Sequence, residues 1–233
     1  MHTKCDERTD RGKTICPPTN CRGGINMITG LKRSSETGDS RLPITRQMLQ
    51  QIVRVLSCVC TSQFEVKLFT AALALVFHGL FRVGELTVGN RYAQHTVQHS
   101  NVKVFDKYVE MYLPTLKTDQ FGKGYTIQIC KHEDSTVCPV STLGSYLGFR
   151  PNFQGPLFCH FDGKSLSSYQ YTAVLKKTLA LLGHDTANYK SHSFRIGMAT
   201  SLTLEGFTDD QIKAMGRWKS DCCDGAFEYL SKE

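Results

Sequence analysis

Three side chains lie in segments whose residue types and spacing suit the binding of a phosphate group. His192 and Arg195 are three positions apart at the start of an expected helix over 193–205, so their side chains face the same way. The backbone N–H groups at a helix start favour an anion at the same place. Arg82 follows an apolar segment, and Glu85 is close enough to orient its guanidinium. Taken singly, the first segment also fits a capped helix start with a surface Arg, and the second a structural Arg–Glu pair.

Two further segments carry side chains that could act on the same group. Lys117 and Lys123 lie in a polar, glycine-containing stretch between two expected strands. A lysine on such a turn can reach over a substrate, although most are simply solvated. Trp218 is the only tryptophan, and Tyr229 is the only tyrosine that follows it. A tyrosine hydroxyl is a poor nucleophile at its ordinary pKa, so it needs a base and a cationic site.

The segments between these residues predict the elements that must position them. Thr45 and the pair Ser62 and Glu65 are typical of helix starts. Helical spacing or stop signals predict helices over 49–59, 63–78, 139–147, 168–182 and 193–205, with a short one after Thr208; strands are expected at 101–105, 108–113 and 125–130, and 157–161 is compatible with another. This order predicts an α+β fold, a mostly helical domain with a small antiparallel three-stranded sheet.

Composition separates the first 41 residues from the rest. Residues 1–41 are basic and lack apolar periodicity, which predicts a disordered tail, either an arm that follows DNA or a segment without a role. Residues 42–233 are patterned as one domain. The net charge of +7 favours an anionic partner. The longest apolar run, over 73–81, is interrupted and far shorter than the ~20 residues of a membrane span, so no membrane association is expected.

The ten cysteines are expected to be reduced thiols, because no signal peptide opens the chain and the chain is longer than small disulfide-stapled domains. Cys5, Cys16 and Cys21 are irregularly spaced and have no nearby fourth ligand. A zinc site is therefore not expected, and the sequence predicts neither a metal nor a small-molecule cofactor.

Taken together and in order, four segments resemble the catalytic domain of the tyrosine recombinases, also called the phage-integrase family. They are Phe-Arg-Val-Gly-Glu-Leu at 81–86, Lys-Thr-Asp-Gln-Phe-Gly-Lys-Gly at 117–124, His-Ser-Phe-Arg-Ile-Gly at 192–197 and Gly-Arg-Trp at 216–218. The sequences of these segments are most similar to those of recombinases from DIRS and Ngaro-like retrotransposons. The resemblance covers about 42–233.

The resemblance implies a role for each candidate residue. Arg82 resembles the first catalytic Arg, with Glu85 supporting it; Lys117 resembles the lysine of the strand turn, with Lys123 as the alternative; His192 and Arg195 match the His-x-x-Arg pair, Trp218 the His-or-Trp position and Tyr229 the nucleophile. The implied activity is cleavage and rejoining of double-stranded DNA through a 3′-phosphotyrosine, in recombination or integration. Neither a metal nor a nucleotide cofactor is implied. Self-assembly only on DNA and a nuclear location are expected.

Three features depart from the family. Ten residues separate Trp218 from Tyr229, a few more than in the family, and removal of residues 223–225 would restore the spacing and sequence pattern that are usual for the family. With the last residue at Glu233, we expect no tail helix, and because residues 1–41 are too few for the N-terminal core-binding domain, we expect that domain to be absent. These departures keep two alternatives open: a catalytically inactive, transposon-derived DNA-binding remnant, and an enzyme resembling type IB topoisomerases. For the recombinase, Arg82, Lys117, His192, Arg195 and Trp218 must converge on one basic concave face.

Overall fold

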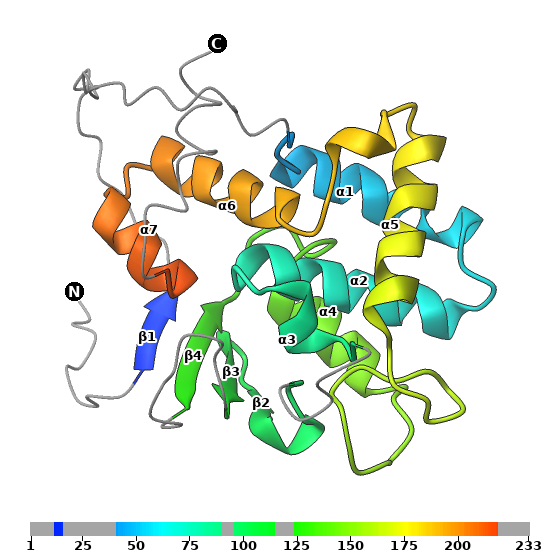
Figure 1. Ribbon diagram of the computed structural model, residues 1–233. Coiled ribbons are helices and arrows are strands. Elements are labelled where there is room, and N and C mark those ends of the chain that lie inside the picture. The colour runs from blue at the N-terminus through cyan, green and yellow to red at the C-terminus, as the bar shows by residue number, and fades with distance from the viewer. Residues whose placement is uncertain (1–11, 16–40, 90–95, 115–123, 219–233) are drawn as a thin grey trace.

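Helices pack on one side of a small sheet in the computed structural model, which describes residues 12–15, 41–89, 96–114 and 124–218 (Figure 1). The helices are α1 (Arg46–Val55), α2 (Gln63–His78), α3 (Val83–Leu86), α4 (Pro139–Leu147), α5 (Ser168–Leu181), α6 (Ser193–Leu204) and α7 (Asp209–Gly216), with short 3-10 turns at Leu56–Cys58, His99–Asn101 and Thr186–Asn188. The predicted α+β fold is confirmed.

The helix starts that the sequence predicted are capped by side chains. The Thr45 hydroxyl accepts from the Met48 backbone N–H at 3.2 Å, and Ser62 accepts from Glu65 at 3.2 Å. Thr208 accepts from the backbone N–H of Gln211 in the same way. These bonds satisfy N–H groups that have no partner within the helix. Local sequence therefore decides where α1, α2 and α7 begin.

Helix α2 forms the centre of the core. Its residues from Leu68 to His78 are buried apart from Thr70, and it packs against α1, α4 and α6. A helix that is apolar all round can only be buried. Its last turn is followed by Leu80, whose left-handed backbone (φ 50°) redirects the chain toward Arg82.

The sheet has the strand order β1-β4-β3-β2. β2 (Val102–Val104), β3 (Tyr108–Leu113) and β4 (Tyr125–Cys130) are antiparallel, as predicted. β1 (Gly12–Ile15) adds a parallel strand to the free edge of β4 (Figure 1). The sequence did not predict β1, because a strand of four residues within a polar segment gives no periodic signal. The other residues of the predicted tail before Arg41 lie outside the described ones.

Two sequence expectations need correction. Residues 157–161 form no strand of the sheet and contribute only an isolated bridge between Cys159 and Ser165. Leu157, Phe158 and Cys159 are buried, and the carbonyls of Leu157 and Cys159 accept from the side chains of Tyr146 and Arg150 instead of from a neighbouring strand. Among the described cysteines, Cys58, Cys60, Cys138 and Cys159 are free thiols, but Cys130 is disulfide-bonded. None of the described helices is both long enough and apolar enough to cross a membrane.

A close backbone contact joins α6 to the chain that enters α1. The backbone N–H of Ile44 donates to the carbonyl of Ser193 at 2.9 Å. One turn later, a Cβ added at Gly197 would lie 1.8 Å from the carbonyl oxygen of Ile44. Only glycine fits there without displacing backbone, and this contact fixes the position of the first turn of α6.

Candidate functional site

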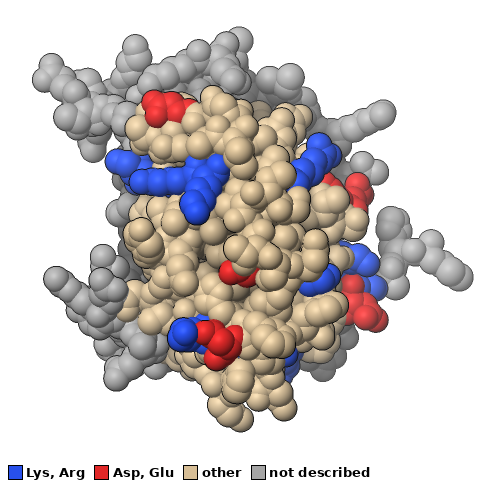
Figure 2. All heavy atoms as spheres, turned by 90° about the vertical axis from the view of Figure 1, so that its right-hand side faces the viewer, with Lys and Arg blue, Asp and Glu red and all other residues tan. Residues whose placement is uncertain are grey.

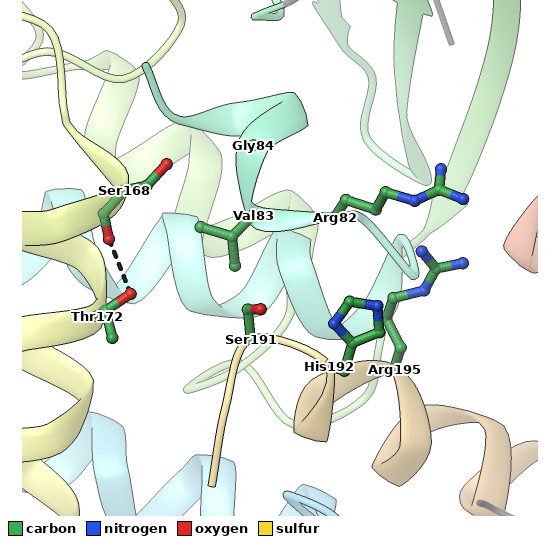
Figure 3. Close-up of a pocket in the computed structure, with 8 residues that line it drawn as sticks. All are labelled: Arg82, Val83, Gly84, Ser168, Thr172, Ser191, His192 and Arg195. Carbon is green, nitrogen blue, oxygen red and sulfur yellow. Dashed lines mark hydrogen bonds between the residues drawn. The ribbon is translucent and has the colours of Figure 1, made fainter. Parts of the chain in front are cut away.

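A cavity of about 220 Å³ lies where the start of α3 meets the starts of α5 and α6. Arg82, His192 and Arg195 line one side, and Ser168, Thr172 and Ser191 are among the residues that line the rest. In Figure 3 the guanidinium groups of Arg82 and Arg195 point the same way, and the His192 ring lies beside Arg195. The structure therefore brings together three of the residues that the sequence singled out.

Arg82 is held by Glu85, one turn further along the chain. The Glu85 carboxylate accepts from the Arg82 backbone N–H at 2.9 Å and from Nη1 at 3.2 Å. The Glu85 side chain is 10% exposed and that of Arg82 is 28% exposed. The pair therefore anchors one edge of the guanidinium inside the fold while the group still reaches solvent. Charge-assisted bonds of this kind are strong and directional.

Arg195 is positioned by the end of α7. It lies in the first turn of α6, is 4% exposed, and donates from Nη2 to the carbonyl of Gly216 at 2.9 Å. The Trp218 ring lies against the same guanidinium, with its centroid 4.8 Å from Cζ. Planar guanidinium groups stack well on aromatic faces. Trp218 thus joins the cluster by supporting Arg195.

Arg217, which the sequence did not single out, binds the same carboxylate as Arg82. Its side chain is 4% exposed, and Nη2 donates to the Glu85 carboxylate at 3.2 Å. Burial lowers the pKa of Arg217, and the negative charge of Glu85 acts in the opposite direction. Glu85 therefore joins two arginines, Arg82 and Arg217. The sequence signal for Arg217 was weak, because this residue lies between Gly216 and Trp218, in a segment whose functional role was assigned to Trp218.

The hydroxyl groups of the cavity were also missed. Thr172 Oγ1 donates to the carbonyl of Ser168 at 2.8 Å, a bond drawn in Figure 3. The Ser168 hydroxyl lies 2.6 Å from the Thr87 hydroxyl, and the Thr87 hydroxyl donates to the backbone carbonyl of Val83. Serine and threonine near a helix start are interpreted from sequence as caps, so nothing in the sequence indicated that Ser168 and Thr172 line the same cavity as the arginines.

Two arginines, Arg82 and Arg195, line the cavity, and a third, Arg217, is close to Arg82 through the shared Glu85 carboxylate. Among the described contacts of these arginines, Glu85 is the carboxylate that pairs with Arg82 and Arg217. Charge is distributed differently on the face that lies at the right of Figure 1, where small groups of Lys and Arg lie near Asp and Glu on a mostly uncharged surface (Figure 2). A concentrated cluster of N–H donors suits a phosphate, whose oxygens accept several bonds at once.

Three of the predicted site residues, Lys117, Lys123 and Tyr229, lie outside the described residues. The pairing of Leu113 with Tyr125 shows only that the segment with both lysines connects β3 to β4. Within the described part of the chain, no group of three or more His, Cys, Asp or Glu side chains could hold a metal ion.

Comparison with known proteins gives a likeness to recombinase structures. No protein-family model and no characterised protein sequence matches the chain. The solved structure of XerA recombinase aligns with a TM-score of 0.57 and 16% identity over 82% of this chain and 64% of XerA. The XerH site-specific recombinase bound to its difH substrate aligns with a TM-score of 0.54 and 14% identity over 82% of this chain. The chain spans about half of XerH, 51% of its length. The fold is therefore that of tyrosine recombinase catalytic domains.

Proposed function

We propose that this protein is a DNA-binding tyrosine recombinase that cleaves and rejoins double-stranded DNA through a 3′-phosphotyrosine. The observation that carries the proposal is the convergence of Arg82, His192 and Arg195 on one cavity, with Trp218 stacked on Arg195. Two guanidiniums and an imidazole can donate to the oxygens of one phosphodiester. Such donors stabilise the extra negative charge of the transition state, and this stabilisation usually contributes most to the rate in sites of this kind.

The proposed reaction follows from these roles. The oxygen of Tyr229 attacks the scissile phosphorus, a P–O bond to tyrosine forms and the P–O5′ bond breaks. His192 takes the tyrosine proton, and Lys117, or Lys123 in the same segment, gives a proton to the departing 5′ oxygen. The phosphotyrosine retains the energy of the broken bond, so attack by a 5′-hydroxyl rejoins the strand without a nucleotide cofactor or metal.

The proposed partner is double-stranded DNA. XerH in the matched structure is bound to a recombination substrate, and Flpe, with a TM-score of 0.50 and 14% identity, is in a complex with a Holliday junction. Both observations support DNA as the partner of this chain. We further propose, from the sequence resemblance, an origin close to DIRS and Ngaro-like elements, assembly of copies only on DNA, and a nuclear location.

One observation favours an inactive DNA-binding remnant as a second candidate. Ten residues separate Trp218 from Tyr229. If residues 223–225 are an insertion in a helix, each of them would shift the Tyr229 side chain by ~1.5 Å along the axis and rotate it by about a quarter of a turn. The phosphate site could then persist without a nucleophile in reach.

A nicked suicide substrate separates these functions. The recombinase is expected to form a covalent DNA adduct that is lost in Tyr229→Phe and strongly reduced in Arg195→Ala, while Tyr229→Phe still binds duplex. Binding without any adduct would support the remnant instead. Relaxation of supercoiled DNA without strand exchange would support a topoisomerase-like enzyme.

A further inference from the structure

The end of α7 contacts Arg195 directly and contacts Glu85, the residue that holds Arg82. The carbonyl of Gly216 accepts from Arg195 at 2.9 Å, and the guanidinium of Arg217 donates to Glu85 at 3.2 Å. Glu85 in turn holds Arg82. Two consecutive residues therefore reach, directly or through one carboxylate, the two cations that come from α3 and α6.

Arg217 is held in a conformation that has to be maintained by its surroundings. Its backbone is left-handed, with φ 56° and ψ 41°, a region that residues other than glycine seldom occupy. Such strain persists where the surrounding contacts determine the geometry, and it is frequent at functional sites. A glycine would relieve the strain at this helix end. The structure nevertheless places a large charged side chain there and buries it.

The described hydrogen bonds and ring contact of the Arg217 side chain lead to the segment that carries Arg82. Nη1 donates to the carbonyl of Gly79 at 3.3 Å and Nη2 to that of Leu80 at 3.4 Å. The guanidinium also lies over the Phe81 ring, 5.2 Å from its centroid. Gly79, Leu80 and Phe81 form the turn between α2 and Arg82. Arg217 thus contacts both the backbone before Arg82 and the carboxylate beside it.

We propose that Arg217 is a positioning residue, which fixes the Arg82 guanidinium toward the scissile phosphate by sharing Glu85 and by bonding the 79–81 turn. This inference rests on the proposed function, since it assigns the positioned group a phosphate. A shared carboxylate neutralises Arg82 less than one paired with Arg82 alone. Without Arg217, Glu85 has Arg82 as its remaining cationic partner in this cluster and draws that charge away from the cavity.

A double-mutant cycle tests the proposal. Arg82→Ala, Arg217→Gly and the double variant are compared with the wild type for affinity to duplex DNA and for adduct formation on the nicked substrate. Glycine suits the left-handed backbone, so Arg217→Gly is expected to remain folded, which thermal unfolding checks. Arg54→Ala, which removes an exposed guanidinium of α1 outside the cavity lining, is the control for loss of one charge.

The expected outcome is non-additive. Arg82→Ala weakens DNA binding about tenfold, Arg217→Gly about three- to tenfold, and the double variant no more than about twofold beyond Arg82→Ala. Adduct formation by Arg217→Gly falls about ten- to a hundredfold, while Arg54→Ala changes affinity by no more than about twofold. Losses that multiply in the double variant would overturn the proposal, as would wild-type behaviour of a folded Arg217→Gly.

The same design keeps this inference separate from the proposed function. Absence of a Tyr229-dependent adduct in the wild type counts against the recombinase, while the binding cycle still reports on Arg217. If the wild type does not bind DNA, the cycle is repeated with inorganic phosphate, followed by the rise in the unfolding temperature. A rise that is lost equally in Arg82→Ala, Arg217→Gly and the double variant supports positioning; an unchanged rise in Arg217→Gly refutes it.

Discussion

Replacement of Gly197 by alanine tests whether the contact between α6 and the entry to α1 positions the cavity. The added Cβ would lie 1.8 Å from the carbonyl oxygen and 2.5 Å from the carbonyl carbon of Ile44. Both atoms belong to backbone, so no side-chain rotation can relieve the clash. The helix and the 41–45 segment must separate, and the 2.9 Å hydrogen bond from Ile44 to Ser193 lies in the same contact.

The magnitude follows from opposing effects. Ordinary van der Waals contact begins near 3.4 Å, so the groups must separate by about 1.6 Å. Overpacking costs about 1–3 kcal/mol, and loss of the hydrogen bond costs about 1 kcal/mol more. Alanine returns about 1 kcal/mol of helix propensity. We expect the free energy of unfolding to fall by about 1–3 kcal/mol, and adduct formation to fall about a hundredfold if His192 and Arg195 move by about 1 Å.

Urea unfolding and the adduct assay measure the two effects. Gly144→Ala is the matched control, because Gly144 lies on the exposed face of α4 and an added Cβ there meets no atom within 4 Å. It should raise stability by up to about 1 kcal/mol and leave adduct formation unchanged. Equal stability of Gly197→Ala and wild type would refute the reasoning. A destabilised Gly197→Ala with full activity would show that the contact does not position the site.

Three further expectations concern acid stability, DNA affinity and the spacing before Tyr229. Burial lowers the pKa of His78 from 6.5 to about 3. Below pH 6.5 the unfolded chain therefore binds a proton that the folded chain does not. As the pH decreases in this range, the free energy of unfolding decreases by up to about 1.4 kcal/mol per pH unit. His78→Gln should flatten this slope in urea unfolding between pH 7 and 5, and an unchanged slope would exclude His78 as its source. Arg195→Ala should weaken duplex binding and reduce the steepness of its salt dependence by about one phosphate contact; a salt-independent wild type would contradict this. Deletion of Cys223, Asp224 and Gly225 should increase adduct formation, whereas efficient adduct formation by the original chain would show that the spacing is tolerated.

The sequence by itself determined the local elements. Thr45, Ser62 and Thr208 cap helices through bonds to residues three positions away, and such contacts depend only on neighbouring residues. The continuous apolar character of α2 required burial, whatever packed against it. The pair His192 and Arg195 shares one helix turn, so its spacing alone placed both side chains on one side.

Only the tertiary structure decided what these elements meet. Arg82 and Arg195 share a cavity because of how α3, α6 and α7 pack, and Arg217 reaches Glu85 across the core. The parallel pairing of β1 with β4 likewise joins segments far apart in the chain. Contacts of this kind have no sequence period, since their partners depend on the path of all the intervening chain. The sequence therefore identified Arg82, His192 and Arg195, with Glu85 as a local support, but not Arg217, whereas packing decided which of these groups meet at one cavity.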